Sequence, residues 1–214
     1  MRYRILLAAR SRAALVPAAA WLFVLVGVYA YNENEVRDSY AITALLLCPL
    51  TAWLAVALSH AEPAPQRELL AAASGRGPAA TLAVGAAAAG VLGLVAGAVD
   101  IVWPVVSGAF DRPVMASDLA VAAVAHGGCA AYGAALGTFA SARLVARPGV
   151  AFAALAGAAI AAVPLFELAP PLSPAAWTAD VLIDGGTIAG PAVALALHAT
   201  AVVALAAWAL RRTA

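Results

Sequence analysis

The sequence contains no lysine, and only 11% of its 214 residues are charged. A soluble domain carries charge on roughly a quarter of its residues. A Walker A loop needs a lysine that reaches the terminal phosphates of a nucleotide. The chain therefore cannot hold such a loop, and we expect that it does not hydrolyse a nucleotide by itself. Its net charge of +1 gives no general attraction to nucleic acid, so we expect no nucleic-acid partner.

Motifs for other chemistry are also missing from the sequence. It contains no H-E-x-x-H, C-x-x-C or G-x-S-x-G, so neither a zinc site nor a hydrolase nucleophile is indicated. The two cysteines, Cys48 and Cys129, lie inside apolar runs, where small core residues are a simpler interpretation than a disulfide. We expect no catalytic residues, no metal and no cofactor bound by this chain. A membrane enzyme is the interpretation that the sequence favours least.

What the sequence does contain is apolar residues, which make up 65% of the chain and give a mean hydropathy of +0.95. They form runs of about 20 residues, the length that crosses a bilayer as a helix. These runs predict an all-α membrane protein with six transmembrane helices in a single domain over residues 1–214. The expected spans are 13–31, 40–59, 79–102, 119–140, 150–166 and 188–210.

The first apolar run has a second interpretation as a signal peptide. Basic residues precede it, and Val28-Tyr29-Ala30 could form a small-residue cleavage site. However, its apolar stretch is longer than the usual 7–15 residues of a signal peptide. We therefore favour a first transmembrane span.

The arginines predict the orientation of the spans. If the chain starts in the cytoplasm, the outer segments hold only Arg37 and Arg112, whereas the short inner segments hold Arg2, Arg4, Arg10, Arg12, Arg67, Arg76, Arg143, Arg147, Arg211 and Arg212. This asymmetry follows the positive-inside rule and predicts that both termini are cytoplasmic. Trp103 and Trp177 suit an outer aromatic belt. The abundance of alanine and arginine indicates a GC-rich bacterial genome, so we expect a multi-pass protein of the bacterial inner (plasma) membrane.

Three polar residues within the expected spans are candidates for a substrate path: His126 and Tyr132 in the fourth span and His198 in the sixth. Ionisable groups inside a membrane are costly and often functional. A hydrogen bond to a neighbouring backbone or hydroxyl group is the simpler interpretation of each histidine, and a place in a proton path or ligand contact is the alternative. Asp100 lies near the outer end of the third span, and we expect it to reach water.

Small residues one helical turn apart let two helix backbones approach closely in lipid. Three such G-x-x-x-G pairs occur: Gly93 and Gly97, Gly133 and Gly137, Gly186 and Gly190. We interpret them as packing within the chain rather than as a dimer seam. Prolines within or at the edges of spans are expected to bend them, namely Pro17, Pro49 and Pro164.

The longest inner loop, 60–78, predicts a short helix at the inner membrane surface. Prolines mark its entry, residues 66–74 are good helix formers, and Gly75-Arg76-Gly77-Pro78 ends the helix. Its polar side carries Arg67 and Glu68, and Leu69 and Leu70 add apolar area. This helix is the best place in the sequence to receive a cytoplasmic partner.

On the outer side, residues 166–187 are too many for a tight turn and too apolar for a solvated loop. Prolines divide the segment, and residues 175–183 predict a short helix that carries Trp177. The segment, which includes Pro174, suits a re-entrant loop that dips into the outer leaflet where protein or water covers its backbone. A merely interfacial, proline-rich loop is the alternative.

Two motifs resemble those of the permease subunits of the ABC type-2 transporter family. Gln66-Arg67-Glu68-Leu69-Leu70, followed by alanines, is similar to the family's charged cluster and Glu-Leu-Leu between spans two and three. Leu172-Ser173-Pro174-Ala175-Ala176-Trp177 is similar to the Ser-Pro motif and aromatic residue before its last span. The resemblance covers the whole chain, although the Gly-Thr pair that usually precedes Glu-Leu-Leu is absent.

The resemblance implies an ABC exporter in which a separate ATPase subunit binds ATP and Mg and docks on the coupling helix around Gln66, Arg67, Glu68, Leu69 and Leu70. A second permease copy or a homologue would complete the substrate path as a dimer. The few buried charges favour an amphipathic or lipophilic cargo such as a drug, peptide antibiotic or lipid.

Two other functions stay open. One is a proton-coupled carrier that uses His126, His198 or Asp100, although the halves of the chain show no convincing repeat. The other is a non-transporting accessory membrane protein. A neighbouring gene for a Walker A ATPase would favour the exporter over the carrier.

Overall fold

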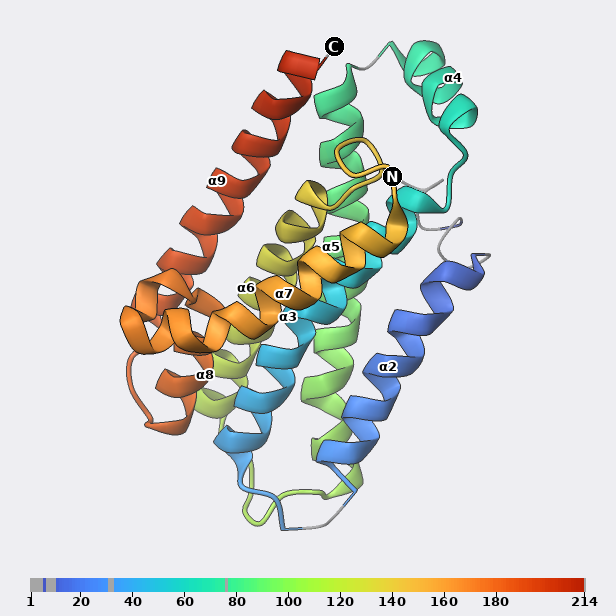
Figure 1. Ribbon diagram of the computed structural model, residues 1–214. Helices are drawn as coiled ribbons and strands as arrows, with labels where there is room; N and C mark the ends of the chain where they lie inside the picture. Colours follow the sequence, from blue (N-terminus) through green and yellow to red (C-terminus); the bar gives the residue numbers. More distant parts are fainter. Residues whose placement is uncertain (1–5, 7–10, 31–32, 76, 214) are drawn as a thin grey trace.

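The computed structural model describes residues 6, 11–30, 33–75 and 77–213, and in this part of the chain the regular secondary structure is helical. A single isolated β-bridge joins Asn34 to Phe110. Figure 1 shows the helices in chain order: α2 (Arg12–Val28), α3 (Val36–His60), α4 (Ala64–Ser74), α5 (Pro78–Ser107), α6 (Ala116–Phe139), α7 (Pro148–Leu168), the 3-10 turn η1 (Pro170–Leu172), α8 (Pro174–Ile183) and α9 (Ala189–Thr213).

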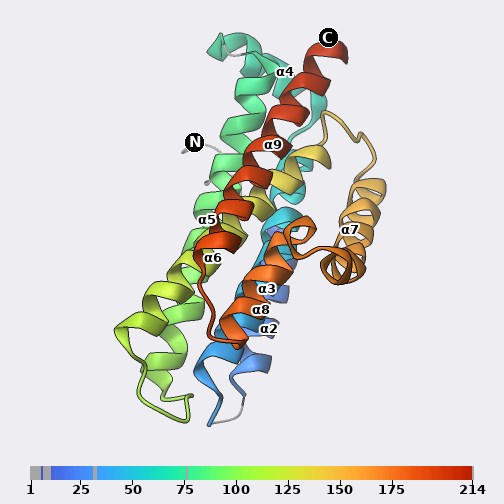
Figure 2. The ribbon, with the colours of Figure 1, turned by 90° about the vertical axis from the view of Figure 1, so that its left-hand side faces the viewer.

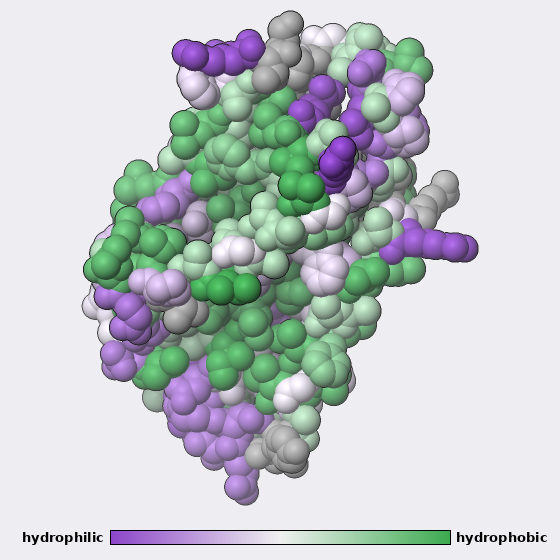
Figure 3. Space-filling view, viewed as in Figure 1, coloured by the Kyte–Doolittle hydropathy of each residue, from purple (hydrophilic) through white to green (hydrophobic). Residues whose placement is uncertain are grey.

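Within the described residues, five helices are long and apolar enough to cross a membrane: α3, α5, α6, α7 and α9. Helix α2 has 17 residues, at the lower limit of what spans a bilayer. Figure 3 shows hydrophobic side chains across the middle of the molecule and most hydrophilic ones toward its two ends. The structure thus confirms an all-α protein of membrane-embedded character, while the count of six spans stays a prediction.

Several helices extend beyond the apolar runs that predict them. Helix α3 begins at Val36 rather than at Tyr40, and the Glu35 side chain caps it by accepting a hydrogen bond from the Asp38 backbone N–H. Helix α5 continues to Ser107, where Gly108 ends it with a positive φ of 67°. The short helices expected at 66–74 and 175–183 are present as α4 and α8.

Helix α3 lies at the centre of the bundle and packs on α2, α5, α6, α7 and α8. Its contact with α6 is a close approach of two backbones. A Cβ atom added to Gly133 would collide with the Cys48 carbonyl, and one added to Gly137 would lie 2.7 Å from the Ala52 carbonyl oxygen. This G-x-x-x-G pair therefore packs within the chain, as the sequence analysis expects.

The other two glycine pairs also face neighbouring parts of the same chain. A Cβ atom on Gly93 would lie 2.8 Å from the Thr51 hydroxyl oxygen of α3, and one on Gly97 would lie 3.1 Å from the Cβ of His126 in α6. At the start of α9, a Cβ on Gly190 would lie 3.0 Å from the Trp177 ring. The interpretation of these pairs as intrachain packing is confirmed.

The two ends of the bundle differ in arginine content. Helix α4, the 140–147 connection and the end of α9 lie toward one end in Figures 1 and 2, and the start of α3 and the 108–115 connection lie at the other. Five described arginines belong to the first group: Arg67, Arg143, Arg147, Arg211 and Arg212. Arg37 and Arg112 lie at the second end. Four further arginines that predict the orientation fall outside the described residues: Arg2, Arg4, Arg10 and Arg76. Tyr31, at the end of the first expected span, also falls outside them.

Helix α7 is peripheral. In its most apolar window 6% of the residues are buried, against 61% in α3. Figures 1 and 2 show α7 crossing α3 obliquely, apart from the upright helices. Helix α8 lies beside the half of α3 that begins at Val36. The prolines expected to bend spans lie inside helices, at Pro17, Pro49 and Pro164, and α5 contains a further one at Pro104.

The contact of Gly133 with α3 generates a stability prediction. Gly133→Ala should lower the free energy of unfolding by about 1–3 kcal/mol or more, because its methyl group has no space against the Cys48 carbonyl. The matched control is Gly157→Ala in α7, where an added Cβ meets nothing within 4 Å and should be neutral or slightly stabilising. Unfolding in mixed detergent micelles measures both, and equal stabilities would contradict the packing described.

Candidate functional site

The predicted coupling helix, α4, projects from the arginine-rich end of the bundle (Figure 1). Pro63 precedes it, and Gly75 ends it in the left-handed conformation with φ 62°. Its described side chains are all exposed or half-buried. Leu69 is 70% exposed and Leu70 40% exposed, and Gln66 and Glu68 are exposed beside them. The helix therefore offers an apolar and acidic surface at the end of the bundle.

Arg67 is turned differently from its neighbours on α4. Its Nη1 donates hydrogen bonds to the Glu62 carbonyl oxygen at 2.6 Å and the Ser59 carbonyl oxygen at 3.4 Å. Ser59 lies in the last turn of α3, where helix carbonyls lack intrahelical partners, and Glu62 lies in the connection between α3 and α4. Arg67 thus ties α4 to the end of α3, a contact that the sequence does not reveal.

His126 lies in the core between α3 and α6 and is 2% exposed. Its Nδ1 lies 2.8 Å from the Ala122 carbonyl oxygen, and its Nε2 lies 3.0 Å from the Thr43 hydroxyl oxygen. Because a carbonyl only accepts, Nδ1 carries a proton. The Thr43 hydroxyl beside Nε2 also donates a 3.0 Å hydrogen bond to the Ser39 carbonyl oxygen. Both ring nitrogens thus have partners of the kinds that the simpler interpretation expects.

His198 and Tyr132 meet at the interface of α9 with α6. Their ring centroids are 6.1 Å apart at an interplanar angle of 82°, and His198 Nδ1 lies 2.9 Å from the Ala194 carbonyl oxygen. In the described part of the chain, no hydrogen bond or ring contact joins either residue to His126. The structure therefore separates the three polar candidates into two places.

The expectation that Asp100 reaches water is wrong. Asp100 is 2% exposed, and its Oδ1 accepts a hydrogen bond of 2.9 Å from the indole nitrogen of Trp21 in α2. Helix α5 continues to Ser107, about two turns beyond Asp100, so the carboxylate lies well inside the helix end. A carboxylate buried in this way needs a donor, and Trp21 supplies one.

A second carboxylate, that of Asp118 in α6, forms ion pairs with two arginines at the opposite end of the bundle. Asp118 Oδ2 lies 2.8 Å from Arg112 Nη1, and Asp118 Oδ1 lies 3.4 Å from Arg37 Nε. Oδ2 also accepts from the Met115 backbone N–H and so caps α6. The hydrogen bond to Asp118 raises the pKa of Arg112 above its usual value, which keeps this guanidinium charged. These contacts join the start of α3 to the 108–115 connection.

A cavity of about 370 Å³ lies between α2, α3 and α5. Its lining is almost entirely apolar and consists of Ala14, Leu15, Pro17, Ala18, Trp21, Leu47, Leu50, Thr51, Leu54, Leu92, Gly93, Val95 and Ala96. Helix α2 packs on α3 and leaves this space beside α5. The cavity suits an apolar group of a ligand or lipid.

The segment after α7, which the sequence predicts on the outer side, is packed rather than solvated. Helix α8 buries Ala175, Ala179 and Leu182 in one cluster with residues of α3, α6 and α9. Pro174 begins α8, and its carbonyl accepts a 2.7 Å hydrogen bond from Thr178. Figures 1 and 2 place α8 between the end of α7 and the start of α9. This arrangement suits the re-entrant interpretation.

Comparison of the chain with protein families, curated proteins and solved structures finds no match. Within the described residues, no group of three or more His, Cys, Asp or Glu side chains could hold a metal ion. The class that the structure defines is a helical, membrane-embedded protein with a surface helix at one end. The ABC type-2 resemblance stays a prediction.

The bond between Trp21 and Asp100 generates the second prediction. Trp21→Phe removes the donor to a buried carboxylate and should lower the free energy of unfolding by about 1–3 kcal/mol. Trp103→Phe is the control, because Trp103 is 52% exposed and makes no hydrogen bond to a described residue. Unfolding in mixed micelles compares the two, and an equal loss in both variants would show that the bond contributes nothing.

Proposed function

We propose that this chain is the transmembrane permease subunit of an ATP-driven exporter, and that a separate ATPase docks on α4. The observation that carries the proposal is the exposed surface of α4, where Glu68, Leu69 and Leu70 project at the end of the bundle. An isolated helix of 11 residues is marginally stable in water. A partner that buries its two leucines would stabilise it.

The contacts of α4 supply a route for mechanical coupling. Helix α4 follows α3 and precedes α5 in the chain, and Arg67 bonds the end of α3. A displacement of α4 by an ATPase therefore acts on the central helix α3 at once. Because α3 packs on α2, α5 and α8, its movement changes the walls of the cavity beside α2.

The orientation in this proposal places α4 and both termini in the cytoplasm, with six spans in the bacterial inner membrane. It is supported by the arginines that gather toward the end of the bundle carrying α4. The nearly apolar cavity of about 370 Å³ supports an amphipathic or lipophilic cargo. A second permease copy or a homologue would complete the path as a dimer.

A proton-coupled carrier has less support. Both ring nitrogens of His126 are engaged within a nearly closed core, and His198 lies in a separate contact with Tyr132. No chain of described hydrogen bonds connects these residues to Asp100, which accepts its hydrogen bond from Trp21. The geometry of α4 therefore favours the ATPase-driven function.

Single cysteines test the orientation. Cys48 and Cys129 are buried and should react little with a maleimide that cannot cross membranes. In intact spheroplasts, Asp111→Cys in the 108–115 connection should be labelled, whereas Ala72→Cys on α4 should react only after the membrane is opened. Labelling in the reverse order would overturn the cytoplasmic placement of α4.

Docking is tested by co-expression with candidate ABC ATPases, purification through a tag on this chain, and ATPase assays in lipid. Wild type should retain an ATPase, and the double variant Glu68→Ala/Leu69→Ala should lower retention and coupled activity by about tenfold. Leu172→Ala, which removes an exposed leucine from η1, is the control.

Arg67 is left unchanged in this test, because its loss would also displace α4 from the end of α3. If no ATPase is retained by wild type, or if the double variant retains it as well as the control does, the proposed function is wrong.

A further inference from the structure

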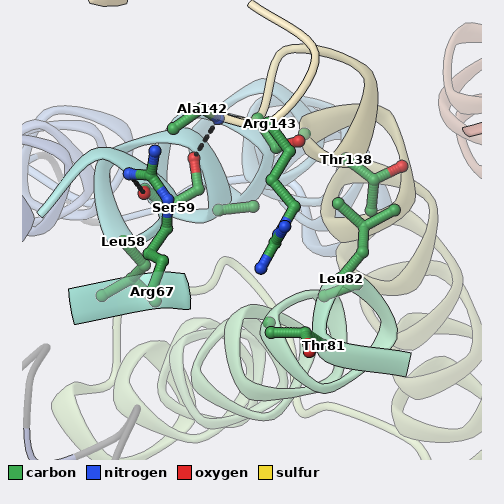
Figure 4. A pocket seen from close by; sticks show the side chains of 13 residues that line it. Leu58, Ser59, Arg67, Thr81, Leu82, Thr138, Ala142 and Arg143 are labelled. Atoms are coloured by element: carbon green, nitrogen blue, oxygen red, sulfur yellow. Dashed lines mark hydrogen bonds between the residues drawn. The ribbon is translucent and has the colours of Figure 1, made fainter. Parts of the chain in front are cut away.

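Two arginines and several hydroxyl groups line a small cavity at the end of the bundle that carries α4. The cavity has a volume of about 40 Å³ and lies among the ends of α3, α5 and α6, beneath α4. Figure 4 shows it from close by. Its polar lining residues are Ser59, Arg67, Thr81, Thr138, Ser141 and Arg143, and its lining contains no acidic residue.

The two arginines reach the cavity from different segments. In Figure 4, Arg143 extends from the 140–147 connection into the space, and Arg67 approaches from α4. The Nη1 of Arg67 donates to two carbonyl oxygens. A guanidinium has five N–H donors, so Nε and Nη2 of Arg67 add donors beyond these bonds.

The hydroxyl groups that line the cavity differ in their hydrogen bonds. Ser59, Thr81 and Thr138 each donate to a backbone carbonyl of their own helix or its cap, at Val56, Gly77 and Ala135. Ser141 differs, since it is 4% exposed and its Oγ has no hydrogen-bond partner among the described residues. Buried hydroxyl groups are nearly always hydrogen-bonded, so the Ser141 hydroxyl is a donor that an acceptor in the cavity would satisfy.

We propose that this cavity binds a phosphate group through Arg67, Arg143 and Ser141. Arginine forks match the geometry of phosphate oxygens, and a phosphate has enough acceptor oxygens for two guanidinium groups and a hydroxyl. A cavity of about 40 Å³ holds about three water molecules, which is close to the size of one phosphate group. Phosphate binding at this cavity does not require that an ATPase binds α4.

The phosphate can belong to a membrane lipid or to free inorganic phosphate. The surroundings favour a lipid. Leu58 and Leu82 form apolar walls of the cavity, and Ala86 lines both this cavity and an apolar groove of about 560 Å³ between α5, α6 and α9. A lipid whose phosphate lies between the arginines has an apolar surface for an acyl chain directly beside it.

Native mass spectrometry of the full-length chain in detergent tests the site. The protein is titrated with phosphatidylglycerol, with phosphatidylcholine, and with inorganic phosphate in separate arms. Arg143→Gln should weaken binding of phosphatidylglycerol by about tenfold or more, and Ser141→Ala by a few-fold. Arg143→Lys, which keeps the charge but loses the fork, should fall between wild type and Arg143→Gln. Arg147→Gln is the matched control, because Arg147 is exposed in the same connection and does not line the cavity.

Each outcome decides the proposal. A loss of affinity for phosphatidylglycerol in the variants supports a lipid ligand. A loss of affinity for inorganic phosphate alone supports the site with free phosphate as its ligand. Circular dichroism checks folding, and if Arg143→Gln loses helix content, Ser141→Ala and Arg143→Lys carry the comparison. If these variants bind phosphatidylglycerol and inorganic phosphate as tightly as Arg147→Gln does, the site does not exist.

Discussion

The close approach of α3 and α6 is the contact on which the other features depend. Lipid provides little hydrophobic drive for helices to associate, so close packing at small residues has to hold the bundle together. Gly133 and Gly137 allow the α6 backbone to touch α3 at Cys48 and Ala52. With α3 fixed in the centre, α8 packs on its first half, around Ala41 and Ala44, and Arg67 joins α4 to its end.

Polar contacts between helices complete this arrangement, and each joins segments far apart in sequence. Trp21 and Asp100 join α2 to α5, and Thr43 and His126 join α3 to α6. In a membrane an unpaired polar group is costly, so each pair specifies which helices are neighbours as much as it stabilises them. Asp118 likewise joins the start of α3 to the 108–115 connection through Arg37 and Arg112.

The sequence predicts the long apolar helices that a bilayer requires. It does not predict contacts between residues that lie far apart in the chain. Apolar runs identify the long helices to within a few residues, and prolines and glycines locate α4 and α8. The burial of Asp100 could not be predicted, because its partner Trp21 lies 79 positions away. The inward turn of Arg67 depends on where α3 ends, and the cavity shared with Arg143 depends on the tertiary packing of three helices. A single sequence reports helix length and amphipathicity but not these contacts.

The oblique position of α7 makes it the part of the bundle that responds to the membrane itself. At 21 residues it is about 32 Å long, enough to cross a hydrocarbon core only if it stands nearly upright. Few of its side chains are held by other helices, whereas α3 and α6 are locked together. A change in bilayer thickness would alter the tilt of α7 before that of the packed helices, and α8, which follows through η1, contacts both α7 and α3.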